Sequence, residues 1–343
     1  MNRRRTGTGL LLWVGLGMAS ACGGGQSAAV GHKDKRATAD SSQGAVLPPA
    51  NPLVEEGESL LAQGKVTEAS EVFRRALVGN PQDARAHFDR GLIAEHEGRN
   101  PDAMREYQTA ISHEPRFAQP MSNLALLYRD QGHLDRAHAL LLKVVDLSPK
   151  DGEAWLNLAL TLEDQGKIPA AKMRYRTAIK LLPHDPVPRV NLGLLLLDAK
   201  EYGEARTLLR EAMPLSTGDR AMLFAVGSGL RRAKDPASAL RAMRAAVIAD
   251  STEPPPSVVA ELALAELAMG ERHQAISTLR GLIRSRPKYA LAHYLLGNML
   301  AAEQQYAEAV LNYQRYLTLD PQGAEAANAK RRMAMAKRAS KRP

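Results

Sequence analysis

The chain has 343 residues, of which 45% are hydrophobic but only 4% aromatic, and its formal net charge is +9. This composition, rich in alanine and leucine, suits packed helices better than a β-rich core. Seven cationic residues and no acidic one lie between Lys330 and Arg342. Most of the excess charge is therefore in a C-terminal tail, and the rest of the chain is closer to balance.

The N-terminus has the pattern of an export signal. Three arginines at positions 3–5 precede nine apolar residues from Leu10 to Met18, and the small residues Ala19, Ser20 and Ala21 follow. Nine apolar residues are too few to span a bilayer, whereas a basic start, a short apolar core and small residues are typical of a signal peptide. We therefore predict a signal peptide at residues 1–21 and an exported protein.

Cys22 is the one cysteine of the chain and directly follows the small residues. The arrangement resembles a bacterial lipobox, which implies lipidation of Cys22 after cleavage before it. Gly23 at the next position then implies sorting to the periplasmic face of the outer membrane. Ala19 stands where a lipobox usually has leucine, so a soluble exported protein with a free thiol is the alternative. Residues 22–49 lack helical periodicity, and we expect them to form a flexible tether.

The stretch from Gly152 to Asp185 reads as two helices and a turn. The first expected helix, 153–165, has apolar residues at the spacing of one helix face: Trp155, Leu158, Ala159 and Leu162. The second expected helix is marked in the same way by Ala171, Tyr175 and Ala178, and Pro183 ends it. Gly166 between them suits a tight turn. We predict a helical hairpin.

This hairpin recurs along the chain. Prolines that end a second helix are 34 residues apart at Pro81, Pro115, Pro149 and Pro183. A small residue of the second helix keeps the same period, with one longer step where two residues are inserted near Pro254; it is Ala69, Ala103, Ala137, Ala171, Ala205, Ala239, Ala275 and Ala309. A fixed period of this length indicates a repeat architecture.

The pattern resembles the tetratricopeptide repeat (TPR), with W-x2-L-G-x2-Y, A-x3-F, A and P at period 34. The resemblance implies an all-α fold, a right-handed α-solenoid of about eight TPR helical hairpins with a C-terminal capping helix. We expect repeats 1–5 over 50–219, repeats 6–8 over 220–323, and the capping helix and basic tail over 324–343. Lys200 and Lys234 replace the turn glycine in repeats five and six, so we expect irregularity or a hinge there.

In TPR proteins the second, fifth, sixth, ninth and twelfth repeat positions commonly face a concave groove. The sixth position carries Asn123, Asn157 and Asn191 in repeats three to five. A column of amides can bond the backbone of an extended peptide without reading its sequence. The resemblance thus predicts a protein-binding groove. The alternative is that each asparagine bonds a neighbouring hairpin.

Apolar residues at the fifth and ninth positions extend the predicted groove. They are Phe88, Leu126, Leu156, Leu160, Val190, Leu194, Phe224 and Tyr294. Exposed apolar patches usually mark a partner site, but the same residues also suit the core between helices. The fifth position carries no lysine in any repeat, so the carboxylate clamp of chaperone-binding TPR domains is not expected.

No motif of catalysis or metal binding stands out. The sequence has no HExxH, no GxSxG, no Walker loop and no cysteine pair. We predict a protein that is not an enzyme, with no catalytic residue, cofactor or metal. The basic tail is expected to make weak contacts with anionic groups such as acidic lipids or peptidoglycan, and export argues against nucleic acid.

The resemblance favours a scaffold lipoprotein that holds a segment of a partner protein in its groove. TPR lipoproteins of this plan resemble the pilotins and assembly factors of outer-membrane machines such as pilus secretins. Two alternatives stay open. One is a structural or peptidoglycan-associated envelope lipoprotein, and the other is an adaptor that recruits a cell-wall hydrolase or a polysaccharide-export enzyme.

Overall fold

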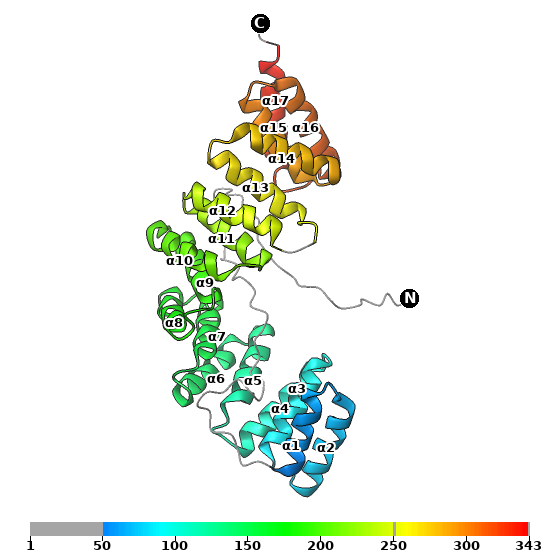
Figure 1. Ribbon diagram of the computed structural model, residues 1–343, viewed down its shortest axis with the longest axis vertical. Coiled ribbons are helices and arrows are strands. Elements are labelled where there is room, and N and C mark those ends of the chain that lie inside the picture. Colours follow the sequence, from blue (N-terminus) through cyan, green and yellow to red (C-terminus); the bar gives the residue numbers. More distant parts are fainter. Residues whose placement is uncertain (1–50, 250–251, 342–343) are drawn as a thin grey trace. The chain divides into compact units, whose positions relative to one another are not determined.

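The computed structural model describes residues 51–249 and 252–341, and all the regular secondary structure in these ranges is helical (Figure 1). The described chain divides into two compact units between Pro188 and Arg189. We call residues 51–188 the N-terminal unit and residues 189–341 the C-terminal unit. The predicted all-helical solenoid of hairpins is confirmed.

The N-terminal unit consists of four helical hairpins. Its helices are α1 (Pro52–Ala62), α2 (Val66–Gly79), α3 (Ala84–His96), α4 (Asn100–His113), α5 (Ala118–Asp130), α6 (Leu134–Leu147), α7 (Gly152–Asp164) and α8 (Ile168–Leu181). Each odd-numbered helix packs most extensively on the helix that follows it, and α2, α4 and α6 also pack on the first helix of the next hairpin. Contacts are thus confined to neighbours, as expected of a repeat array.

The C-terminal unit continues the pattern and ends in one extra helix. Its helices are α9 (Val187–Asp198, in this unit from Arg189), α10 (Tyr202–Leu215), α11 (Arg220–Arg232), α12 (Pro236–Ile248), α13 (Pro256–Ala268), α14 (Arg272–Ser285), α15 (Ala290–Ala302), α16 (Tyr306–Leu319) and α17 (Ala326–Ala339). The inserted residues lie between α12 and α13, where Pro256 begins the second of these helices.

Repeat positions are counted from residues 50, 84, 118, 152, 186, 220, 256 and 290. The core of each hairpin is built on one residue of its second helix, at repeat position 24. This residue is fully buried in all eight hairpins: Phe73, Tyr107, Leu141, Tyr175, Leu209, Met243, Leu279 and Tyr313. A glycine of the first helix, at position 8, gives several of these side chains room. At Gly91 an added Cβ would lie 2.4 Å from a ring carbon of Tyr107. Large buried side chains and small facing residues explain how a chain with few aromatics packs its hairpins.

The turn inside each hairpin keeps one backbone conformation, even where glycine is replaced. Gly166 has a φ of 72°, and Lys200 and Lys234 have φ values of 62° and 59° at the equivalent position. The turns of repeats five and six are therefore regular, and the expected irregularity or hinge of the superhelix around these repeats stays a prediction. A non-glycine residue in this region costs about 1–2 kcal/mol, which packing of the whole hairpin offsets.

In three places a side chain at repeat position 4 joins neighbouring hairpins. Trp155 donates from its ring N–H to the carbonyl oxygen of Pro149, 2.9 Å away, in the loop that ends the preceding hairpin. His87 and His293 occupy the same position, and a ring nitrogen of each lies 3.1–3.2 Å from the carbonyl oxygen of Pro81 and Pro287 respectively. The contact satisfies a carbonyl beyond the helix end.

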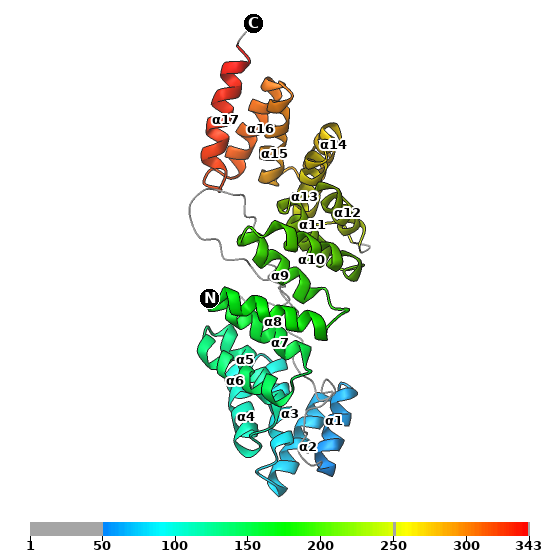
Figure 2. The same ribbon diagram turned by 90° about the vertical axis from the view of Figure 1, so that its left-hand side faces the viewer.

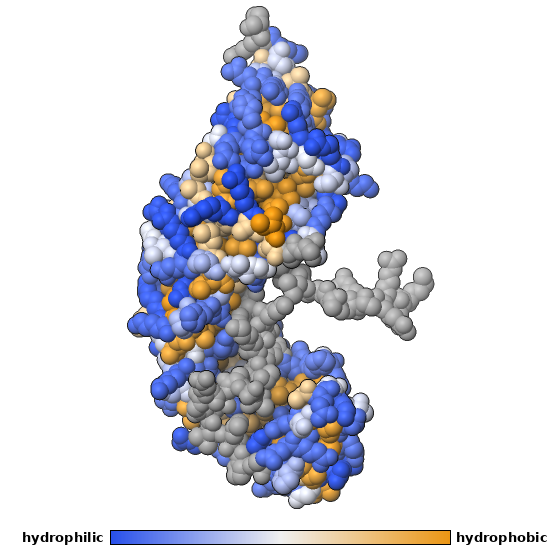
Figure 3. Space-filling view, viewed as in Figure 1, coloured by the Kyte–Doolittle hydropathy of each residue, from blue (hydrophilic) through white to orange (hydrophobic). Residues whose placement is uncertain are grey.

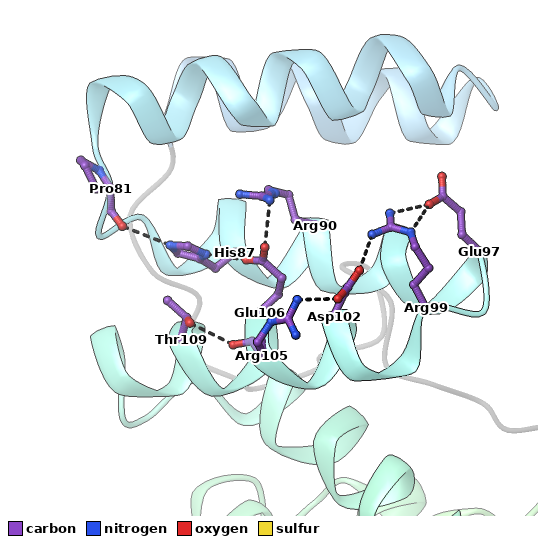
Figure 4. Close-up of polar contacts among 9 residues, drawn as sticks. All are labelled: Pro81, His87, Arg90, Glu97, Arg99, Asp102, Arg105, Glu106 and Thr109. Carbon is purple, nitrogen blue, oxygen red and sulfur yellow. Dashed lines mark hydrogen bonds and ion pairs between the residues drawn. The ribbon is translucent and has the colours of Figure 1, made fainter.

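His87 also joins the two helices of its own hairpin (Figure 4). Its Nδ1 lies 2.7 Å from an oxygen of Glu106 on α4, whose other oxygen lies 2.9 Å from Arg90. Both ring nitrogens of His87 face acceptors, so the imidazolium form makes both hydrogen bonds. The bond to Glu106 is the main cause that raises the pKa of His87, against burial.

Helix α17 covers the last hairpin. It packs on α16, beside which it lies in Figure 2, and Ala326 and Ala329 join the apolar cluster that contains Tyr313 and Tyr316. The backbone N–H of Glu325 donates to the Tyr316 hydroxyl at 3.1 Å. The helix thus closes the apolar face that a further hairpin would otherwise cover.

Candidate partner-binding face

In each unit, the candidate site is the face of the odd-numbered helices that carries repeat positions 5, 6 and 9, which we call the first-helix face. All eleven residues predicted to line the groove are between 0% and 9% exposed. Because side chains in the hairpin core are buried as well, burial alone does not separate a binding role from packing. The contacts of individual side chains do this better.

Asn123 on α5 belongs to a network between two hairpins. Its side-chain N–H donates to the Tyr107 hydroxyl at 3.3 Å, and that hydroxyl donates its own proton to Glu95 at 2.7 Å. Since the single proton of Tyr107 is used in this way, the hydroxyl can only accept from Asn123. Asn123 thus makes the bond to a neighbouring hairpin that the sequence offered as an alternative. Its role in partner binding stays a prediction.

Asn157 on α7 occupies the same position one repeat later and is 5% exposed. Leu156 and Leu160 lie on the same helix, with Leu126 on α5, and all three are buried. These residues of the N-terminal unit lie at the predicted positions on successive first helices. The C-terminal unit has Val190, Asn191 and Leu194 on α9, Phe224 on α11 and Tyr294 on α15, and all five are buried.

The aromatic members of the face contribute to packing within their units. Phe88 lies 5.8 Å from the Tyr107 ring and 5.2 Å from the Phe117 ring, between centroids. Tyr294 lies 5.4 Å from the Tyr316 ring. Such pairs stabilise a fold by about 0.5–1.5 kcal/mol beyond burial. These two residues therefore have a structural role, whatever they contact in a complex.

Charged residues connect consecutive first helices along the same face. Arg85 on α3 pairs with Glu58 on α1 at 2.6 Å, and Arg231 on α11 pairs with Glu261 on α13 at 2.7 Å. These pairs were not predicted from the sequence. Their spacing, about one repeat, is the signal that would have found them.

Asp89 was also missed. It lies on α3 at repeat position 6, the position of Asn123 and Asn157 in the next two repeats. Its side chain is 1% exposed. Counting positions from the fixed period would have placed it in the same column as the asparagines. The column in the N-terminal unit thus has two acids followed by two amides; the first acid, Glu55, is exposed, and Asp89 is buried.

Other kinds of site were sought in the part of the chain that the structure describes. There, no group of three or more His, Cys, Asp or Glu side chains is arranged to hold a metal ion, and no helix is long and apolar enough to cross a membrane. Figure 3 shows a largely hydrophilic visible face on the N-terminal unit, with small hydrophobic patches. The predicted signal peptide, Cys22 and the predicted tether lie outside the described residues.

Comparison with known proteins identifies the repeat. Residues 54–118, 122–186, 159–220 and 261–324 match the family described as tetratricopeptide repeat. No curated protein sequence matches the chain. The fold is similar to that of PilF from Pseudomonas aeruginosa, at 22% identity and a TM-score of 0.50 over 56% of this chain and 87% of that one. A tetratricopeptide repeat protein from Parabacteroides merdae is similar at 17% identity and a TM-score of 0.51, over 72% of this chain and 97% of that one.

Proposed function

Since the chain belongs to the tetratricopeptide repeat family, we propose that it is a non-enzymatic adaptor that holds an extended segment of a partner protein on its first-helix face. The tetratricopeptide repeat fold is typically a scaffold for protein–protein interaction, and some members bind peptides in a groove. Function in such a fold depends on surface residues and not on the fold itself.

The observation that carries the proposal is the column at repeat position 6. Asp89, Asn123 and Asn157 follow one another on α3, α5 and α7, with apolar residues at positions 5 and 9 beside them. Amides spaced along consecutive helices match the repeating N–H and C=O groups of an extended peptide. The apolar neighbours supply contact area for its side chains.

We expect replacement of Asn123, Asn157 and Asn191 by alanine to reduce peptide binding at least tenfold, because each alanine leaves peptide backbone groups without a partner. The measurement is capture of a pool of ten-residue peptides, degenerate at every position, on the immobilised full-length chain. Unchanged capture by the triple variant would contradict the proposal.

The matched control replaces three exposed threonines of second helices by alanine. The hydroxyls of Thr109, Thr177 and Thr318 donate to the carbonyl four residues earlier in their own helix, so this variant should capture the pool like the wild type. Circular dichroism of both variants checks that the hairpins still form. Since Asn123 also bonds Tyr107, a loss of helicity would point to folding instead of binding.

We further propose that the protein is exported and anchored through Cys22 at the periplasmic face of the outer membrane, where it assists assembly of a complex of the pilus or secretin type. The pattern of residues 1–22 supports the anchor. The likeness to PilF supports the fold alone. A tether of 27 residues after Cys22 would let the repeats stand about 25 to 30 Å from the membrane.

In cells fed a clickable fatty acid, we expect the wild type to carry the label and Cys22→Ser to carry none. The wild type should fractionate with membranes and the variant with soluble proteins, because stable anchoring requires more than one acyl chain and these attach at the cysteine. An unlabelled, soluble wild type would exclude the anchor and leave the adaptor proposal intact.

A further inference from the structure

Asp89 is the buried acid of the position-6 column in the N-terminal unit, one repeat before Asn123. It lies in α3, and its side chain is 1% exposed. Among the residues that the structure describes, no donor reaches its Oδ2 atom. A buried carboxyl oxygen without a hydrogen bond is unusual, because leaving it unpaired costs about 1–3 kcal/mol.

The neighbouring acids differ from Asp89 in having partners. Glu58 accepts three hydrogen bonds from Arg85, at 2.6 Å, 2.7 Å and 3.2 Å. Asp83 caps α3 by accepting from the backbone N–H groups of Arg85 and Ala86, and it accepts a third bond from Asn51. Arg85, the cation whose charge acts on Asp89, gives its side-chain hydrogen bonds to Glu58. The Oδ2 atom of Asp89 is left without a donor among the described residues.

The charges around Asp89 favour a cation. Burial is the main cause that raises its pKa well above the usual value, and the negative charges of Glu58 and Asp83 add to the effect, while Arg85 opposes it. Three carboxyl groups thus share one guanidinium. A ligand that brings a positive charge and N–H donors would pair Asp89 and offset the excess of acids.

We infer that Asp89 binds one cationic side chain, a lysine ammonium or an arginine guanidinium, of the extended segment held on the first-helix face. The inference rests on the proposed function and adds a specificity to it. The asparagines of the column can bond any backbone, whereas a carboxylate at the same position selects for charge. The segment would place its cationic residue against α3, one repeat before Asn123.

The test compares arginine with citrulline, a neutral residue of nearly the same shape. Two pools of ten-residue peptides are degenerate except at a central residue, which is arginine in one pool and citrulline in the other. They are mixed in equal amounts, captured on the immobilised full-length chain and counted by mass spectrometry. We expect roughly tenfold enrichment of the arginine pool on the wild type, since charge-assisted hydrogen bonds are about twice as strong as neutral ones.

Asp89→Asn should remove the preference while still capturing peptides, because it places an amide where the next two repeats have one. Asp102→Asn is the matched control, since Asp102 lies on α4 and pairs with Arg99 and Arg105; it should keep the preference. Equal capture of both pools by the wild type, or a preference that survives Asp89→Asn, would overturn the inference alone. Failure of the wild type to capture either pool would overturn the proposed function and the inference with it.

Discussion

Gly91→Ala is expected to lower the free energy of unfolding by about 1–3 kcal/mol, the usual cost of overpacking a core. The new methyl group would lie 2.4 Å from one ring carbon of Tyr107 and 2.6 Å from another. The ring has little room to move, because it is fully buried and its hydroxyl bonds both Glu95 and Asn123. Urea unfolding of the full-length chain, followed by circular dichroism, measures the change in midpoint.

Gly281→Ala provides the matched control. Gly281 lies inside α14, and its nearest heavy atom beyond the local backbone, on Arg284, is 3.9 Å from the position of an added Cβ. Alanine should therefore stabilise the protein by about 0.5–1 kcal/mol through its higher helix propensity. A Gly91→Ala variant as stable as the wild type would mean that Tyr107 yields without loss, and would contradict the account of the hairpin core.

Asp89→Asn is expected to raise the free energy of unfolding at pH 7 by about 1–3 kcal/mol, because the amide takes away a negative charge that is costly to bury. The gain should depend on pH, because burial raises the pKa of Asp89 in the folded chain. Between the ordinary aspartate value and this raised pKa, the folded state holds a proton that the unfolded state has lost. Stability of the wild type therefore falls as pH rises through this range.

Urea midpoints of wild type and Asp89→Asn, measured from pH 3 to pH 8, would check the sign. The two proteins should differ least near pH 3, where the carboxyl is protonated in both states, and should diverge as pH rises above about 3.9. Asp102→Asn serves again as the control: the hydrogen bond from Arg99 is the main cause that lowers the pKa of Asp102, so the same pH rise should not favour that variant. A gain from Asp89→Asn that is the same at every pH would show that Asp89 does not titrate as described.

The period of 34 residues was enough to predict the helices closely. The first helix expected at 153–165 is α7 (Gly152–Asp164), and the second helix before Pro183 ends at Leu181. The period did not specify that Lys200 and Lys234 keep the turn conformation of the glycine that they replace. The preference of lysine for negative φ is outweighed at these turns. The burial of apolar surface between the two helices of the hairpin stabilises the fold by more than one strained residue costs.

The candidate site was less accessible to prediction. Repeat position alone placed Asn123 and Asn157 on first helices, but the partner of Asn123 is Tyr107, a residue of the preceding hairpin. Such a bond depends on which side chains meet across an interface, and the period does not specify it. The sequence likewise does not show that the buried Oδ2 atom of Asp89 has no donor among the described residues, because this depends on how the folded helices place their side chains. The residues 1–50 that would carry the anchor lie outside the described structure, so that part of the function still rests on the sequence.

Helix α17 covers the end of the repeat array at which a second copy of the protein could stack. Repeat arrays can grow into filaments when the exposed end of one copy stacks on the start of another. Here α17 occupies the C-terminal end and turns Lys330, Arg331, Lys337 and Arg338 toward solvent, with no acidic residue in the helix. Two copies that met through this end would bring like charges together. We therefore expect the like charges of this end to oppose tail-to-tail pairing of two copies, and the helix itself to occupy the place that the start of another copy would need for head-to-tail stacking.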